Sequence, residues 1–226
     1  MTAPLPLLWT RLFGERADFM NIQTVKVGII STNCYILTDE KTNEAIVIDP
    51  GSKCGQIIDA VKDKNVKYIL LTHGHYDHIL GAAQLKRLTG AALAIGAEDE
   101  ECLRDDILSR AGLHFKEPQE NTCADIILHD GDTLPFAGQT IKVIHTPGHT
   151  PGGVCYLFDE ENALFSGDTL FNLAIGRTDF QGGSDADMAR SLKKIAALSK
   201  NYDVFPGHGP SSTLDYEKKH NPYFVY

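Results

Sequence analysis

The stretch THGHYDH, residues 72–78, places three histidines and an aspartate directly after the apolar run Tyr68–Leu71. That run predicts a buried strand, so the polar cluster lies where the strand ends. Along an extended chain alternate side chains point the same way, which predicts that His73, His75 and Asp77 converge on one side. Imidazole and carboxylate groups suit zinc, iron or manganese, and polar groups beside an apolar strand need partners. The stretch therefore favours a metal site over a polar loop with scattered histidines.

Size and charge narrow the class of protein. The chain has 226 residues with 42% hydrophobic content, which predicts one α/β domain with a substantial core. Its net charge of -9, from 30 acidic and 21 basic residues without a basic cluster, argues against a nucleic-acid partner. No segment approaches the roughly 18 apolar residues that a membrane span needs. We therefore expect no nucleic-acid partner and no membrane span, which leaves a small-molecule substrate as one of the remaining classes.

The five cysteines and the N-terminal residues indicate the cellular compartment and the start of the domain. The cysteines contain no CxxC pair and are odd in number, so we expect a reducing compartment, the cytoplasm, with each cysteine a buried small hydrophobe. Residues 1–19 contain Pro4 and Pro6 and lack a basic leader, which argues against a signal peptide. We expect residues 1–20 to be an N-terminal extension and residues 21–226 to form the domain.

Hydrophobic periodicity predicts a chain with two similar halves, each of strands followed by helices. The halves share an apolar strand that ends in aspartate, at Asp49 and at Asp168. Two sheets packed face to face with helices outside is the simplest way to bury this pattern. The predicted strands cover residues 22–30, 34–38, 45–48, 68–71, 92–95, 125–128, 140–144, 153–158, 163–166 and 204–205. The predicted helices cover residues 55–64, 82–88, 99–111, 185–198 and 214–220.

Three more candidate ligands follow the first cluster, each in a turn rich in glycine or proline after a predicted strand. They are His149 in TPGHTPGG, Asp168 in FSGDTLF and His208 in FPGHGP. Alone, each residue would more often cap a turn or form a local hydrogen bond, but strand ends on a rigid scaffold hold ligands well. Together with the first cluster they make seven candidates, too many for one tetrahedral ion and about right for two. His114, His129, His145 and His220 match no ligand pattern, and we expect them at the surface or in local hydrogen bonds.

This ordered set resembles the metallo-β-lactamase-fold superfamily over residues 21–220, and the resemblance implies an α/β fold, a four-layer αββα sandwich that forms a catalytic domain over residues 21–226. It also implies two divalent metal ions, with zinc expected and iron or manganese as alternatives. It assigns His73, His75 and His149 to the first ion, Asp77, His78 and His208 to the second, and Asp168 to a bridging position. In the same family the position of Asp49 holds a ligand loop by hydrogen bonds, whereas an unrelated Asp before Pro50 would form a turn.

Within the superfamily, SGDTLF and IGRTDF together with PGHGPSSTLDYEKKHNPY look most like the short glyoxalase II-like hydrolases, the hydroxyacylglutathione hydrolases. GRTDFQ is also similar to a segment of the persulfide dioxygenases. True metallo-β-lactamases commonly place a cysteine near the position of Asp168, so the resemblance disfavours antibiotic hydrolysis. His75 stands where flavo-diiron relatives carry glutamate, which disfavours that branch.

The resemblance implies hydrolysis of a thioester such as S-D-lactoylglutathione by a hydroxide that bridges the two ions, with Asp77 and Asp168 as catalytic residues. The alternatives are a mononuclear iron persulfide dioxygenase and a non-catalytic scaffold stabilised by metal. The charge of an acyl-glutathione would have to be met by Arg177, Lys218 or Lys219. Arg177 could instead pair with Asp179, and the two lysines could lie on a solvated helix face.

Overall fold

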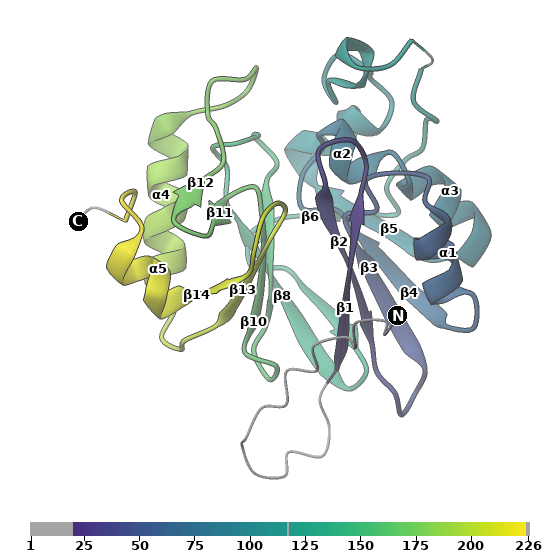
Figure 1. Ribbon diagram of the computed structural model, residues 1–226, viewed down its shortest axis with the longest axis horizontal. Helices are drawn as coiled ribbons and strands as arrows, with labels where there is room; N and C mark the ends of the chain where they lie inside the picture. The colour runs from purple at the N-terminus through teal and green to yellow at the C-terminus, as the bar shows by residue number, and fades with distance from the viewer. Residues whose placement is uncertain (1–19, 117, 225–226) are drawn as a thin grey trace, which may run out of the picture.

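The computed structural model describes residues 20–116 and 118–224, and it forms two six-stranded sheets packed face to face with helices on both outer sides (Figure 1). A two-stranded ribbon, β11 (Leu170–Phe171) with β12 (Ala174–Ile175), lies beside the second sheet. The predicted α/β class and the αββα layering are therefore confirmed.

The first sheet follows the order of the chain. Its strands are β1 (Asn21–Val27), β2 (Thr32–Thr38), β3 (Glu44–Ile48), β4 (Asn65–Leu70), β5 (Ala92–Gly96) and β6 (Ile126–Leu128). Strands β1 to β3 are antiparallel, whereas β3 to β6 run parallel. Parallel neighbours need a crossover, and helices α1 (Gly55–Val61) and α3 (Ala82–Thr89) supply two of them on the outer face (Figure 1).

The second sheet has the order β14-β13-β10-β9-β8-β7. Its strands are β7 (Thr133–Phe136), β8 (Gln139–His145), β9 (Val154–Phe158), β10 (Ala163–Gly167), β13 (Asp203–Pro206) and β14 (Ser212–Thr213). Its one parallel pair, β10 with β13, is connected through α4 (Asp185–Ala196) on the outer face. Helix α5 (Leu214–His220) lies beside α4 and spans the predicted residues (Figure 1).

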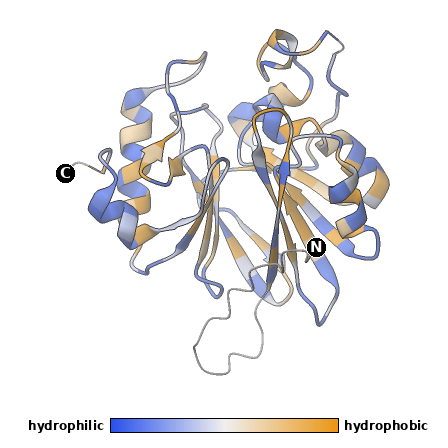
Figure 2. Ribbon diagram, viewed as in Figure 1, coloured by the Kyte–Doolittle hydropathy of each residue, from blue (hydrophilic) through white to orange (hydrophobic). Residues whose placement is uncertain are grey.

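The continuous apolar runs arise because the central strands are buried on both faces. In β3, Ala45 and Val47 face the layer of α1 and α3, whereas Ile46 and Ile48 face the second sheet. In the second sheet, Leu164 of β10 packs toward α4 in the same way. Figure 2 shows the resulting hydrophobic strands at the centre of the molecule.

Several predicted elements differ from the structure. The predicted strand over 22–30 ends at Val27, because a turn follows it. Strand β7, which contains Pro135, was not predicted; it is an edge strand, where a missing backbone N–H is tolerated. The predicted helix over 99–111 is instead the 3-10 helix η1 (Ala97–Leu103) followed by turns, with a second short one, η2 (Ala111–Leu113), at its end.

The predicted extension over residues 1–20 lies outside the described residues except for Met20. The Met20 side chain is buried between the two sheets, and its backbone N–H donates to Glu161 at 3.4 Å. Met20 thus belongs to the folded part.

All five cysteines are free. Cys34, Cys102 and Cys155 are buried as expected, but Cys123 is exposed and Cys54 half-buried, because both lie in irregular segments outside the strands. Within residues 20–116 and 118–224, no helix is both long enough and apolar enough to cross a membrane.

Candidate metal centre

All seven candidate ligands meet where the two sheets end side by side. His73 and His75 lie in the loop after β4, and Asp77 and His78 lie on the short helix α2 (Tyr76–Ile79). His149, Asp168 and His208 follow β8, β10 and β13. Turns at the ends of buried strands bring these residues together because the strands themselves are held firmly in the core.

The expected alternation along THGHYDH ends at His75. Helix α2 begins at Tyr76, so Asp77 is not in line with His73 and His75 as an extended chain would place it. The helical turn instead directs Asp77 and His78 toward His208 from the second sheet. The three side chains do reach one cluster, but Asp77 reaches it from a helical turn rather than from an extended chain, and it belongs to a different donor group from His73 and His75.

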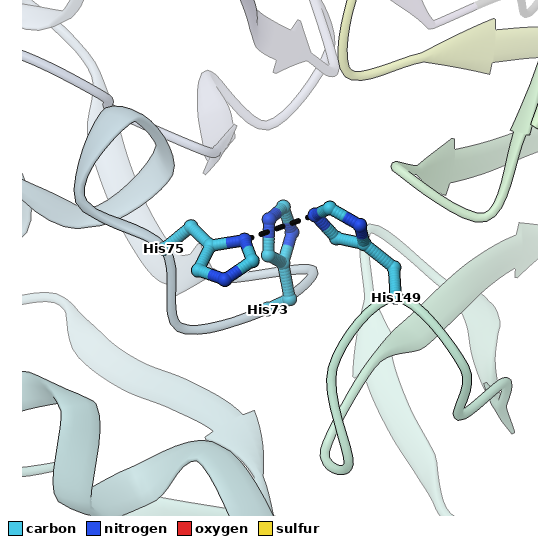
Figure 3. Close-up of side chains that lie close together, drawn as sticks. All are labelled: His73, His75 and His149. Carbon is cyan, nitrogen blue, oxygen red and sulfur yellow. Dashed lines mark hydrogen bonds between the residues drawn. The ribbon is translucent and has the colours of Figure 1, made fainter. Parts of the chain in front are cut away.

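The first group consists of His73, His75 and His149. One ring nitrogen from each lies within 4.8 Å of those of the other two. Nδ1 of His75 and Nε2 of His149 are 2.9 Å apart, and Figure 3 shows the three rings facing one another from two separate loops. Three convergent imidazoles are a common donor set for zinc.

The second group consists of Asp77, His78 and His208. Asp77 Oδ2 lies 3.1 Å from His78 Nε2 and 3.2 Å from His208 Nε2. Asp77 Oδ2 also accepts a hydrogen bond from the Thr32 hydroxyl at 2.8 Å. One carboxylate and two imidazoles make a mixed donor set that suits zinc, iron or manganese.

Asp168 lies between the two groups. Its Oδ1 is 3.5 Å from His78 Nε2, and its Oδ2 is 3.5 Å from His149 Nε2 and 3.7 Å from His208 Nε2. Gly207 makes room for it, because a Cβ at this position would collide with Asp168 Oδ1. The two oxygens of one carboxylate thus face ligands of both groups.

Hydrogen bonds orient three of the imidazoles toward the centre. Nδ1 of His78 lies 2.8 Å from the Asp49 carboxylate, and Nδ1 of His149 lies 2.7 Å from the carbonyl oxygen of Arg177. Both partners are acceptors, so Nδ1 must carry the proton. The Thr72 hydroxyl donates to Asp49 at 2.7 Å, so it can only accept from Nδ1 of His73 at 3.1 Å. Each Nε2 is therefore left with a lone pair that faces the cluster.

Unpartnered buried atoms test whether a cation fits here. Among the described residues, six buried side-chain atoms have no hydrogen-bond partner, and three of them are His73 Nε2, His78 Nε2 and Asp168 Oδ1. Leaving one such atom unsatisfied costs about 1–3 kcal/mol, and native proteins contain few. All three belong to the cluster, so the donor set fits bound divalent metal.

Burial keeps two ligand imidazoles in the neutral form that binds metal. It lowers the pKa of His73 well below its usual value and that of His75 to about 3, so both rings are neutral at neutral pH. Burial also acts to lower the pKa of His78, but the charges of Asp77, Asp49 and Asp168 raise that pKa overall, so binding of a cation there would release a proton. Burial acts to raise the pKa of Asp77, but the charges and hydrogen bonds of His78 and His208 lower it overall. Neutral imidazole and ionised carboxylate are the forms that bind metal.

Asp49, at the end of β3, holds the loop that carries the first ligands. It is buried, adopts a left-handed φ of 53°, and accepts from the Thr72 backbone N–H at 2.8 Å as well as from the Thr72 hydroxyl and His78. Three donors converge on one carboxylate, so its effect on His73 and His78 is indirect, through their orientation.

We expect Asp49→Asn to lower metal affinity by about 10- to 100-fold while the fold is kept, as measured by competition with a chelator. The asparagine NH2 group cannot accept the proton of His78 or Thr72, so one donor loses its partner. Asp63→Asn, in an exposed turn, is the matched control and should bind metal normally. Unchanged affinity in Asp49→Asn would contradict this role.

Asp99 is a positioning residue that periodicity placed in a helix. Its buried carboxylate accepts from the backbone N–H of Gly74 at 2.8 Å and of Gly152 at 2.7 Å. These glycines lie in the loops that carry His73 and His149, so one side chain connects the two halves of the first group. An aspartate between distant loops carries no spacing signal, which is why the sequence did not reveal it.

A cavity of about 610 Å³ opens beside the cluster and is lined by ligands of both groups. Arg177 lines it and forms a two-pronged ion pair with Asp179, with both N–O distances 2.6 Å. Lys218 instead donates to the carbonyl oxygen of Leu198 on the outer layer. The two lysines do not line the cavity, because α5 packs on the far face of the second sheet.

The other wall of the cavity comes from residues with no predicted role. Tyr76, Arg110 and Phe180 line it. His114, expected at the surface, is exposed, but it also lines the cavity and its ring lies 4.5 Å from that of Tyr76. Tyr76 begins α2, Arg110 and His114 flank η2, and Phe180 lies in the loop before α4, so only the tertiary structure brings these segments together.

Comparison with known proteins agrees with this architecture. Residues 27–208 match the family profile of the metallo-beta-lactamase superfamily. The hydroxyacylglutathione hydrolase GloC of Haemophilus influenzae is 34% identical over 213 residues, which cover 90% of this chain and 98% of GloC.

Two solved structures extend the comparison. BLEG-1, a B3 metallo-beta-lactamase, superposes with a TM-score of 0.85 at 33% identity and covers 91% of this chain and 100% of its own. TTHA1623, solved in a di-iron-bound form, has a TM-score of 0.78 at 29% identity and covers 90% of this chain and 100% of its own. The fold, the order of the candidate ligands and the match over residues 27–208 lead to one conclusion: the chain belongs to the metallo-β-lactamase superfamily.

Proposed function

We propose that the protein is a dinuclear metal-dependent hydrolase that cleaves a thioester such as S-D-lactoylglutathione. The observation that carries the proposal is the presence of two donor groups with Asp168 between them. A mononuclear enzyme would need only one of the groups. The similarity to GloC along nearly the whole of both chains makes acyl-glutathione the first substrate class to test.

Distances between the donor atoms support a division of these residues between two cations, although His73, His78 and Asp168 also form a group within 4.8 Å. His73, His75 and His149 would hold one ion, Asp77, His78 and His208 the other, and Asp168 would contact both. Zinc is our first choice and iron or manganese the alternatives, since all three accept nitrogen and oxygen donors. Two such ions supply Lewis-acid polarisation of a carbonyl and lower the pKa of water from about 15.7 to about 7.

The chain's own groups account for the remaining requirements. The ionised Asp77 carboxylate, held by Thr32, can accept a hydrogen bond from an attacking water and so orient it. A thiolate leaves readily because thiols ionise near pH 8.5, so no separate general acid is needed. For location we propose the cytoplasm, where five free cysteines stay reduced.

The decisive experiment is a substrate panel on protein whose metals have been quantified. We expect about two ions per chain and turnover of S-D-lactoylglutathione that disappears with chelation and returns with metal. Two bound ions without thioester turnover would contradict the proposal. One iron per chain with oxygen uptake and sulfite formation from glutathione persulfide would identify the dioxygenase alternative instead.

The likeness to BLEG-1 adds a second candidate, β-lactam hydrolysis. Asp168 in the sequence disfavours this activity, whereas 33% identity to a B3 metallo-beta-lactamase is a reason to test it. A chromogenic cephalosporin therefore belongs in the panel, and turnover of it above that of the thioester would favour this function. A scaffold without activity would lose thermal stability on chelation and turn over no member of the panel.

A further inference from the structure

Arg110 lies at the cavity wall opposite the second sheet. Its guanidinium carbon is 3.5 Å from the centre of the Phe180 ring, and that of Arg177 is 3.9 Å from the same centre. The Phe180 ring is in turn 5.8 Å from the ring of His75, in the first donor group. The Phe180 ring thus contacts the guanidinium groups of both arginines and also lies beside the first donor group.

The backbone holds Arg110 in this place. Arg110 has a left-handed φ of 67°, which an L residue with a long side chain adopts only at a cost. The preceding residue, Ser109, is buried, donates to Gln119 at 2.7 Å, and accepts from the backbone N–H of Tyr76 at 2.8 Å. The backbone just before Arg110 is therefore hydrogen-bonded to Tyr76, the first residue of α2, which directly precedes Asp77.

The charge of Arg110 is free to meet a ligand. Arg177 is neutralised by its two-pronged bond to Asp179, whereas no ion pair joins Arg110 to any carboxylate within the described part of the chain. Arg110 and Arg177 are the two arginines that line the cavity, and Arg177 is the one already paired with a carboxylate. A half-buried guanidinium supported by an aromatic ring is suited to bind a carboxylate with two hydrogen bonds.

We propose that Arg110 binds a carboxylate in the thiol portion of the substrate and so selects thioesters of an acidic thiol peptide. This rests on the proposed thioesterase function. Arg110 is a specificity-determining residue here, because it contacts the part of the substrate that does not react. The lysines considered on α5 lie on the outer layer, so they cannot take this role.

The first test is kinetic, on the metal-loaded enzyme with Arg110→Gln. We expect KM for S-D-lactoylglutathione to rise about tenfold with little change in kcat, since one charge-assisted bond to a remote group is lost. KM for the uncharged S-lactoyl-N-acetylcysteamine should stay the same. Arg110→Lys should fall between the two enzymes, because an ammonium keeps the charge but not the planar pair of donors.

Arg104→Gln is the matched control, because Arg104 is exposed, pairs with Glu100 and does not line the cavity. It should leave both KM values unchanged. If Arg110→Gln raises KM equally for the charged and uncharged thioesters, Arg110 is structural and the inference is overturned. If KM rises instead for a coenzyme A thioester only, the arginine binds phosphate and the carboxylate assignment is wrong.

A binding measurement separates failure of this inference from failure of the proposed function. S-methylglutathione has the carboxylates but no thioester, and we expect its Kd by calorimetry to weaken about tenfold in Arg110→Gln. Arg110-dependent binding without any thioester turnover would overturn the function and leave the carboxylate site standing. If the enzyme turns over the thioester but binds S-methylglutathione equally well with and without Arg110, the inference alone would be overturned.

Discussion

Replacement of Asp168 by alanine is expected to lower metal content from about two ions per chain to one or fewer and to reduce hydrolysis by at least about 100-fold. Oδ1 of Asp168 faces His78, and Oδ2 faces His149 and His208, so this carboxylate lies close to ligands of both donor groups. Without it, no anion remains between the two donor groups to offset a second cation. Metal analysis after gel filtration, combined with steady-state kinetics, measures both effects.

Asp168→Asn and Asp59→Ala serve as comparisons for this variant. Asparagine keeps the shape of the side chain but not its charge, so it should resemble alanine in metal content. Asp59 is exposed on α1, and its variant should behave as wild type. The metal-free Asp168→Ala protein should melt no lower than metal-free wild type, because Asp168 Oδ1 is buried without a partner there. Full metal occupancy with normal turnover in Asp168→Ala would contradict the assignment of Asp168 to both ions.

Asp77→Ala is expected to retain about one ion per chain and to lose most activity, on the order of 100-fold. The first donor group, His73, His75 and His149, does not include Asp77 and should still bind. The second ion would keep His78, His208 and the shared Asp168 but lose the carboxylate that belongs to it alone, so its site should bind more weakly. Metal titration followed by absorbance of a cobalt-substituted protein reports on the two sites separately.

A double variant tests whether Asp77 and His208 serve the same ion. Asp77 Oδ2 and His208 Nε2 lie 3.2 Å apart, so the effects of the two substitutions should not add if both residues hold one cation. Asp77→Ala with His208→Ala should therefore be about as inactive as Asp77→Ala alone. Fully additive losses would show that Asp77 and His208 act independently, and the second site would have to be redrawn.

Much of this protein could be predicted from local pattern. The two-sided burial of β3 and β10 appears as unbroken apolar runs, and the amphipathic pattern over residues 185–198 predicted α4 to within two residues of its end. The candidate ligands could be found because three such residues follow the THGHYDH cluster in order, each in a turn after a predicted strand, although each one alone would more often be structural. Their order along the chain was enough to indicate the superfamily.

Other features depend on contacts between segments that are far apart in the chain. The sequence did not show that α2 begins at Tyr76 and separates Asp77 from His75, because tertiary packing overrode the extended alternation. It also did not show that Asp99 connects the loops of Gly74 and Gly152.

The sequence by itself thus determined the layers of the fold and the identity of the candidate ligands. Hydrophobic periodicity indicates the layers, and the chemistry of neighbouring residues indicates the ligands. Only the tertiary structure decided how those ligands divide between two groups, and which residues form the substrate wall. Arg110 and Phe180 come from different halves of the chain and contact each other in the structure. The residues next to either one in sequence give no indication of this contact. Contacts of this kind arise from the packing of separate loops, so they leave no short-range signal for sequence analysis to detect.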